Sequence, residues 1–527
     1  MRSTPEQIST RRHHFNKLLL LIPVAVVILC VAAFFIIQAI SGGKITLTPG
    51  KLIFEKSVTS AEQSFINSVL DGYTLPNDIT VSAREDYSYT PSWQMHMTKC
   101  LDSCNDPKAD PDKSIDVIYN ISVPVSEFYT STFNIASSNL PNTTSTFTTP
   151  DGYTVKYTDL KDLTYENRLL SLDSHYYFDG YNSGALFRIL NFTGDNVKEA
   201  AEKVSAQAPK YPDQNQVLSL TQTGVTALSR GMVTKLNQTG SPTYFSEKIA
   251  TFLKASDLTH ISNEVSFADG CPGGNNTTTL CSDWRLLGTI QDIGTDIVEL
   301  TGNHNNDYGA DANLATIAKY EEIGLKTFGG GKDETSAAVP LEINQKDNHI
   351  TLLGYNQSTS TKANGQGASG SQPGANIYSE EKAKADIVAA KERGDFIIVD
   401  IQYFECYSYP DEGQEMPSCD APITGQAEFF HQFIDWGADM VVGTQAHQPQ
   451  TFELYNNKPI YYGLGNLFFD QIYWPGTTRS IILTHYFDNN KLLQTRLTPT
   501  VYDINLQVQP MDEETATWFM NRLNAAR

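Results

Sequence analysis

Four short polar motifs in the C-terminal half of the chain each follow an apolar, strand-like run. They are residues 302–309 (GNHNNDYG), 402–405 (QYFE), 443–450 (GTQAHQPQ) and 462–470 (YGLGNLFFD). Asn carbonyls and neutral imidazoles can bind metal ions, and a neighbouring His can give a proton to a leaving oxygen or bind phosphate. The motifs therefore predict a shared polar pocket, with His304 as its candidate general acid.

Any one of these motifs is a weak signal, because a lone His at a strand end is more often a structural hydrogen-bonding group. Four motifs in a fixed order are more specific. Three residues keep two interpretations each. Arg230 is either a clamp for phosphate or carboxylate or one half of a surface ion pair. Asp307 is either part of the site or the cap of a following helix. Asp470 is either part of the site or bonded to nearby backbone.

The elements that position these motifs alternate between strand and helix from residue 216 onward. This pattern predicts an α/β domain with functional loops at its strand ends. We expect strands at 217–220, 297–300, 350–353, 396–401, 440–443 and 460–462, and helices at 310–323, 380–393 and 426–437. The Gly/Ser/Asn-rich residues 357–375 predict a mobile surface loop.

The preceding part of the chain carries no chemical motif. Residues 44–209 are rich in Ser, Thr and Tyr, with strand-like stretches such as 115–123, and residues 200–212 suit a linker because they are polar and contain two prolines. A chain of 527 residues is too long for one ordinary core. We therefore expect a mixed α/β domain over 44–209, a second domain over 216–503, and a C-terminal extension over 504–527.

An apolar, uncharged run at residues 18–40 follows the basic residues Arg11, Arg12 and Lys17. About 20 such residues span a bilayer, and the preceding positive charges favour a cytoplasmic N-terminus. A cleaved signal peptide is the alternative, but its apolar core is usually about 7–15 residues long. The sequence predicts a single-pass cell-membrane protein, with residues 1–17 cytoplasmic and the bulk outside.

Cysteine usage agrees with an extracytoplasmic location. Six cysteines fall into close pairs, which favours disulfides over a metal cluster because no CxxC spacing occurs. The pairs are Cys100/Cys104, Cys271/Cys281 and Cys406/Cys419. The net charge of −22 argues against nucleic-acid binding. It also means that an anionic polymer would need a local basic patch.

The order of the motifs resembles the CapA family of poly-γ-glutamate capsule proteins, within the calcineurin-like metallophosphoesterase superfamily. The similarity covers about residues 216–503, including residues 224–230 (GVTALSR) against the family's G-D-x-M-L-x-R and Asn263-Glu264 against its N-x-E. It implies a calcineurin-like layered α/β sandwich and a divalent metal such as Mn, Zn or Fe. It also implies a part in making or exporting a capsule or envelope polymer, alongside other envelope-biosynthesis subunits.

The resemblance also assigns roles to residues. It makes His304 the catalytic residue. It places metal-binding positions at Glu264, Asn303, Gln402, Gln445 and His447. Substrate-binding positions, for an anionic polymer or a phosphate-containing small molecule, fall at Arg230, Asp307, Glu405 and Asn466.

The chain departs from the family where metal would be held. Val225 stands at the opening Asp, and Gln402 and Gln445 stand at two His positions. A two-metal hydrolytic site needs carboxylates and imidazoles, and Gln is a poor substitute for imidazole. We expect a degenerate metal site in a pocket that still binds a polar ligand. An active metal-dependent phosphoesterase and a non-enzymatic ligand-binding module of the envelope remain the alternatives.

Overall fold

The computed structural model describes residues 49–86, 97–98, 113–140, 144–174, 185–212, 216–274, 278–357, 364–406 and 419–527. The apolar run at 18–40 and the Cys100/Cys104 pair lie outside these residues. Within the described ranges, no helix is both long and apolar enough to cross a membrane.

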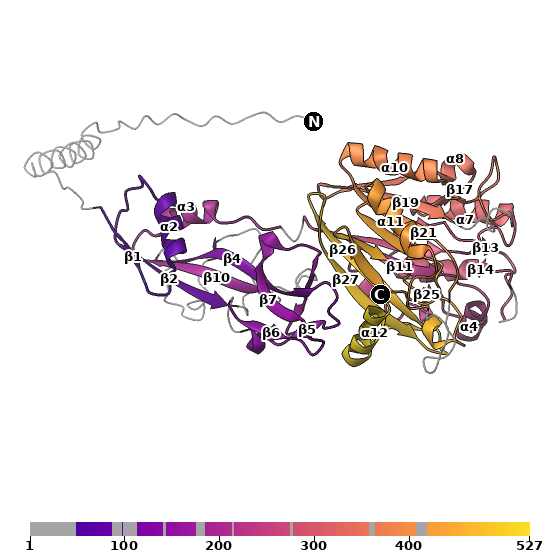
Figure 1. Ribbon diagram of the computed structural model, residues 1–527, viewed down its shortest axis with the longest axis horizontal. Helices are drawn as coiled ribbons and strands as arrows, with labels where there is room; N and C mark the ends of the chain where they lie inside the picture. The colour runs from indigo at the N-terminus through magenta and orange to yellow at the C-terminus, as the bar shows by residue number, and fades with distance from the viewer. Residues whose placement is uncertain are drawn as a thin grey trace, which may run out of the picture.

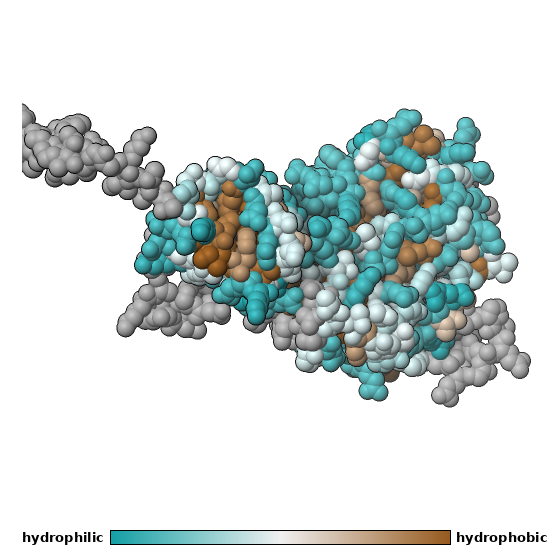
Figure 2. Space-filling model, turned by 60° about the vertical axis from the view of Figure 1, so that its left-hand side comes forward, coloured by the Kyte–Doolittle hydropathy of each residue, from teal (hydrophilic) through white to brown (hydrophobic). Residues whose placement is uncertain are grey.

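The described residues form two lobes, and the N-terminal lobe is built on one mixed sheet (Figure 1). Its path runs β1 (Leu52–Phe54), β2 (Ile79–Asp86), β10 (Leu186–Thr193), β4 (Ser114–Glu127), β7 (Thr154–Asp159) and β6 (Thr146–Thr148). Helices α2 (Ser60–Val69) and α3 (Lys198–Gln207) share an apolar core with β2, β4 and β10. Polar residues dominate the visible face of the C-terminal lobe, and apolar residues gather on the N-terminal lobe (Figure 2).

The C-terminal lobe contains two larger sheets. The first has the order β16 (Lys326–Phe328), β15 (Ile297–Glu299), β12 (Leu258–Asn263), β11 (Leu218–Thr226), β26 (Arg479–Asp488), β27 (Lys491–Tyr502) and β28 (Val508–Pro510), with β25 (Asn466–Phe468) also paired to β11. The second has the order β18 (Leu341–Gln345), β19 (Asn348–Asn356), β21 (Phe396–Gln402), β22 (Met440–Thr444), β24 (Lys458–Tyr461) and β23 (Phe452–Tyr455).

The two sheets pack face to face between outer layers of helices. Leu220 and Ile297 of the first sheet share a core with Leu352, Ile398 and Val442 of the second. The first sheet's other face is covered by α4 (Gly231–Thr239), α6 (Leu287–Asp292) and α7 (Ala310–Glu322), and the second sheet's by α10 (Glu380–Arg393) and α11 (Gln426–Trp436). The predicted layered α/β architecture is confirmed.

The predicted strands and helices of this lobe are also observed. Strand β21 is buried along its whole length, as expected for a parallel strand covered on both faces, and such strands read as continuous apolar runs. The helix predicted at 380–393 has those bounds, and the helix predicted at 310–323 ends one residue earlier.

Two segments predicted to be irregular are so only in part, and residues 358–363 of the second lie outside the described residues. The expected linker at 200–212 begins inside α3, where Ala200, Ala201 and Val204 are buried in the N-terminal core. In the predicted surface loop, Gln366 and Ala375 are buried, and β20 (Gly374–Ala375) pairs with β17 (Gly330–Gly331). Small residues are needed there by close packing, since a Cβ on Gly374 would lie 2.3 Å from the Gln366 carbonyl oxygen.

The two lobes share a packed interface. The ring of Phe128 meets the ring of Phe452 edge-on, with centroids 5.5 Å apart. Helix α12 (Glu513–Ala525), from the C-terminal segment, joins this interface, because Asn521 Oδ1 accepts from Ser131 Oγ at 2.8 Å and Asn524 Nδ2 donates to the Tyr129 carbonyl at 2.6 Å.

Gln494 offers a test of this interface. Its side chain is 1% exposed; Oε1 accepts from Leu169 N at 2.9 Å, and Nε2 donates to the carbonyls of Thr164 (2.7 Å) and Asn167 (2.6 Å). We expect Gln494→Ala to lower the free energy of unfolding by ~1–3 kcal/mol, because it leaves these buried backbone groups unpaired. Thermal and denaturant unfolding of the full chain would measure this change.

The matched control is Gln509→Ala, at an exposed Gln of β28, which should change stability by less than about 0.5 kcal/mol. Equal stabilities of the two variants would contradict a stabilising role for the Gln494 contacts.

Candidate functional site

The candidate site lies where the carboxyl ends of strands from both sheets meet. Asn303 and His304 follow β15, Gln402 ends β21, Gln445 follows β22, and Asn356 ends β19. Ligands of α/β proteins bind in such places, because loops from several parallel strands converge there.

A close backbone approach brings the loops after β12 and β15 together. A Cβ on Gly302 would lie 2.5 Å from the Cα of Glu264, so only glycine fits at this position. The two loops then form an isolated parallel bridge between Val265 and His304. Both Glu264 and His304 consequently line one cavity.

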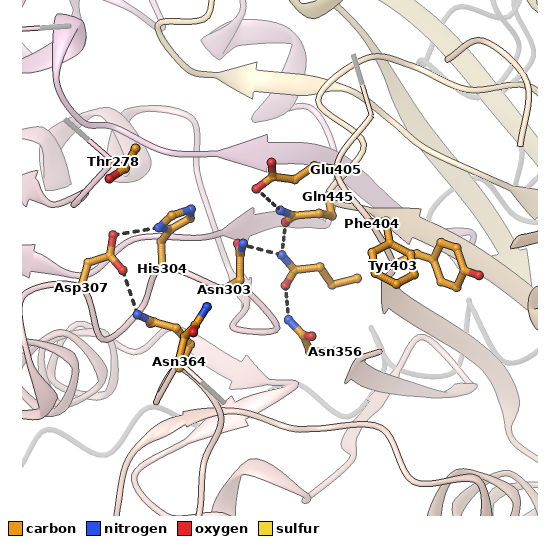
Figure 3. Close-up of a pocket in the computed structure, with 12 residues that line it drawn as sticks. Thr278, Asn303, His304, Asp307, Asn356, Asn364, Tyr403, Phe404, Glu405 and Gln445 are labelled. Carbon is orange, nitrogen blue, oxygen red and sulfur yellow. Dashed lines mark hydrogen bonds and ion pairs between the residues drawn. The ribbon is translucent and has the colours of Figure 1, made fainter. Parts of the chain in front are cut away.

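A chain of hydrogen-bonded amides crosses the site (Figure 3). Asn356 Nδ2 donates to Gln402 Oε1 at 2.8 Å, and Gln402 Nε2 donates to Asn303 Oδ1 at 3.1 Å and to Gln445 Oε1. Gln445 Nε2 in turn donates to Glu405 Oε1 at 3.2 Å. The structure thus brings four of the predicted site residues, Asn303, Gln402, Glu405 and Gln445, into one network.

Asp307 orients His304. Its carboxylate lies 2.7 Å from His304 Nδ1, and it also accepts from Leu280 N (2.7 Å) and Gln366 Nε2 (2.8 Å). Burial alone would lower the pKa of His304, but the Asp307 hydrogen bond and the nearby carboxylate of Glu264 raise the pKa above 6.5. The suggested helix cap is not observed, because α7 begins after Gly309 without a side-chain cap.

Asn466 positions His447, the second histidine of the site, through a hydrogen bond. Its Nδ2 donates to the Thr477 carbonyl at 3.1 Å, so its Oδ1 is the acceptor for His447 Nδ1 at 2.9 Å. This contact places the His447 proton on Nδ1 and leaves Nε2 as the acceptor of the neutral ring. Asn466 is buried and lines neither of the two cavities of the site, so its predicted substrate contact is replaced by a positioning role.

Glu264 lies at the wall of a cavity of about 430 Å³. It is 2% exposed, and neither carboxylate oxygen has a hydrogen-bond partner among the described residues. Burial raises its pKa, and the nearby His447 and His304 oppose that rise. A second cavity of about 560 Å³ contains the amide chain, and Thr278, His304 and Glu405 line both cavities.

Arg230 lines the Glu264 cavity as one half of an ion pair. Its Nε donates to Asp470 Oδ1 at 3.1 Å, while Asp470 Oδ2 accepts from Gly231 N at 2.8 Å. The guanidinium carbon also lies 4.7 Å from the ring centroid of Phe469, within the range of a cation–π contact. Asp470 therefore neutralises Arg230 at the cavity wall and also bonds to backbone.

Sequence reasoning missed the aromatic side chains at the site. Phe469, Tyr473 and Trp474 line the Glu264 cavity, and Phe404 lines the neighbouring one. Tyr473 is 68% exposed and Phe404 is 44% exposed. The aromatic-rich run over residues 468–474 is the sequence feature that could have indicated Phe469, Tyr473 and Trp474.

Two of the predicted disulfides are confirmed and adjoin the site. Cys271–Cys281 closes the segment that carries Thr278 and Leu280, and Cys406–Cys419 starts at the residue after Glu405. Both bonds restrain loops that line the cavities.

The donor set does not fit the two-metal centre that the superfamily implies. Val225 offers no ligand and is buried, and the Gln402 and Gln445 amides are hydrogen-bonded to each other. Among the described residues, no group of three or more His, Cys, Asp or Glu side chains is arranged to hold a metal ion. A hydrolytic pair of metals needs bridging carboxylates and several imidazoles, and this donor set does not provide them.

Behind the site, Glu299 is a buried acid between the sheets. It accepts from the Thr301 hydroxyl, and its Oε2 lies 3.6 Å from His260 Nε2. Burial raises the pKa of Glu299 to about 7 and lowers the pKa of His260 to about 3. The imidazole is therefore neutral at ordinary pH, and the contact is not an ion pair.

Comparisons with known proteins point to one family. A family model described as "Bacterial capsule synthesis protein PGA_cap" matches residues 190–471. The chain is 24% identical over 297 residues to "Capsule biosynthesis protein CapA" of Bacillus anthracis, covering 55% of this chain and 68% of that protein. It is 25% identical over 299 residues to "PGA biosynthesis protein CapA" of Bacillus subtilis (strain 168), covering 56% and 74%.

A shorter match reaches a mycobacterial protein. The chain is 26% identical over 182 residues to a "Probable polyglutamine synthesis accessory protein" of Mycobacterium tuberculosis, covering 32% of this chain and 44% of that protein. The family match spans Arg230 to Asp470 and so contains every predicted site residue.

Glu299 predicts how stability depends on pH. Its folded pKa of about 7 lies above the unfolded value of about 4.3. The stabilisation that its bound proton provides is therefore complete below the unfolded value and is lost as pH rises through about 7. We expect Glu299→Gln to flatten the fall in Tm between pH 5 and pH 8, measured by thermal unfolding. Exposed Glu322→Gln is the control, and equal slopes in all three proteins would refute the assignment.

Metal content provides a second test. We expect purified full-length protein to carry well below one Mn, Zn or Fe per chain by elemental analysis, because three family ligands are replaced. Val225→Asp with Gln402→His and Gln445→His should raise that content, whereas exposed Gln509→His should not. Stoichiometric metal in the unaltered protein would show that the amide network still allows a metal centre.

Proposed function

The chain belongs to the bacterial capsule synthesis protein family PGA_cap, and we propose that it takes part in the biosynthesis or export of a capsule or cell-envelope polymer of the poly-γ-glutamate type. The observation that carries this proposal is the strand-end pocket, whose lining residues lie within the family match except for Tyr473 and Trp474. The names of the relatives, which refer to capsule, PGA and polyglutamine synthesis, support the class of polymer.

The pocket's geometry favours ligand binding over metal-dependent hydrolysis. The amides of Asn303, Gln402 and Gln445 occupy three family metal positions and bond to one another or to Glu405. These groups are neutral, so they cannot acidify a water molecule as a cation does. In this proposal the domain binds part of the polymer or a precursor and works with other envelope-biosynthesis subunits.

A phosphoesterase is the second candidate, and one contact favours it. The short contact with Asp307 helps to raise the pKa of His304 and so favours its protonated form, which can act as a general acid. Turnover of a generic phosphoester with Mn²⁺ that disappears in His304→Ala would make this candidate the preferred one. Absence of turnover, together with ligand binding, supports the binding function.

We also propose that residues 18–40 anchor the protein, with both lobes outside the cytoplasm. The uncharged run, the basic residues before it and two disulfides support this location, since disulfides persist in oxidising compartments. A variant lacking residues 18–40 should leave the membrane fraction. Unchanged membrane association would contradict the anchor.

Deletion of the gene from its host tests the function. We expect cell-bound and released γ-linked glutamate polymer to fall severalfold, as measured from glutamate recovered after acid hydrolysis of the isolated polymer. The full-length gene supplied in trans should restore it. Polymer of unchanged amount and length in the deletion strain would contradict the proposed function.

A further inference from the structure

We propose that the Glu264 cavity binds a protonated primary amine, and that this amine is the free amino end of a glutamate chain. The identity of the chain rests on the function proposed above, whereas the amine follows from the cavity itself. Three features of the cavity support it: an unpaired buried carboxylate, neighbours that already have ion-pair or hydrogen-bond partners, and an adjoining surface suited to an amide-linked chain.

Glu264 lacks the partner that a buried carboxylate requires. It is 2% exposed, and both of its oxygens are without a hydrogen bond among the described residues. Thr226, whose carbonyl accepts from Glu264 N at 3.0 Å, also has a buried hydroxyl without a partner. Buried polar groups are nearly always paired, so the unpaired carboxylate of Glu264 at the cavity wall points to a missing ligand.

The other charged groups around Glu264 already have partners. Arg230 pairs with Asp470, His304 lies against Asp307, and Glu405 accepts from the Gln445 amide. None of these groups donates a hydrogen bond to Glu264. Its carboxylate is therefore the acceptor that an incoming cation would meet.

An ammonium group fits this place better than a metal ion. It offers three N–H donors and needs oxygen acceptors. Glu264 and Glu405, which line the same cavity, supply such acceptors. A divalent metal needs more anionic or imidazole ligands at close range, and the described residues do not provide such a group.

The surroundings suit the rest of an amide-linked acidic chain. His304 also lines the Glu264 cavity, and in its protonated form it can meet a carboxylate next to the amine. The adjoining cavity is lined by the side-chain amides of Asn303, Gln402 and Gln445, which are hydrogen-bond partners for peptide groups (Figure 3). Both volumes, about 430 and 560 Å³, are typical of small-ligand sites.

Isothermal titration calorimetry on the full-length protein in detergent tests the proposal. The probes are γ-linked tri-glutamate with a free amine and the same tripeptide with its amine acetylated. We expect acetylation to weaken binding at least about tenfold, through loss of a charge-assisted contact. Glu264→Gln should weaken the free-amine probe by a similar factor and leave binding of the acetylated probe unchanged.

Exposed Glu322→Gln is the control and should bind both probes like the unaltered protein. Thermal unfolding should show Glu264→Gln to be at least as stable as the unaltered protein at neutral pH, because the substitution removes an unpaired buried charge. Lost binding in that variant is then not a folding defect.

Three results would overturn the proposal. They are failure of the free-amine probe to bind the unaltered protein, equal binding of the two probes, and binding of Mn²⁺ alone that disappears in Glu264→Gln. The gene deletion yields a separate result. Unchanged polymer with Glu264-dependent amine binding would reject the capsule function alone, whereas lost polymer without amine binding would reject the amine site alone.

Discussion

The buried side chain of Asn356 ties the two sheets of the C-terminal lobe together at their carboxyl ends. Its Nδ2 donates to the Thr301 carbonyl at 2.7 Å, across the sandwich, and to Gln402 Oε1 at 2.8 Å within its own sheet. From Gln402 the network continues to Asn303 and Gln445. In a two-metal enzyme, cations bridge groups from several loops. Among the described residues of this protein, neutral amides bridge these loops.

This arrangement leaves several buried acids without a matching charge. Glu264 has no hydrogen-bond partner among the described residues, and burial raises the pKa of Glu299 and of Asp400. Buried carboxylates reduce stability unless they are protonated or paired. Glu299 and Asp400 lie between the sheets, where protonation removes the charge, whereas Glu264 lines a cavity that a ligand can enter. Protonation therefore relieves the unfavourable burial of Glu299 and Asp400, whereas in our proposal a bound ligand relieves that of Glu264.

Much of the C-terminal lobe could be predicted because its strands are covered on both faces. Such strands are continuous apolar runs, and their polar motifs mark the carboxyl ends. Side-chain direction is harder to predict, because it depends on tertiary contacts. Asn466 belongs to a recognisable motif, yet it lines neither cavity, and its amide bonds to His447 and Thr477. Gln366 sits in a Gly-rich segment that resembles a surface loop, yet it bonds to Asp307 because glycines allow that segment to pack closely.

The position of the N-terminal lobe explains how the pocket can stay open while the lobes remain docked. The lobe contacts β23 through Phe452, β27 through Gln494 and α12 through Asn521 and Asn524. None of these elements contributes a lining residue to either cavity of the site. The interface and the pocket therefore use different parts of the C-terminal lobe, and a ligand can enter without separation of the lobes.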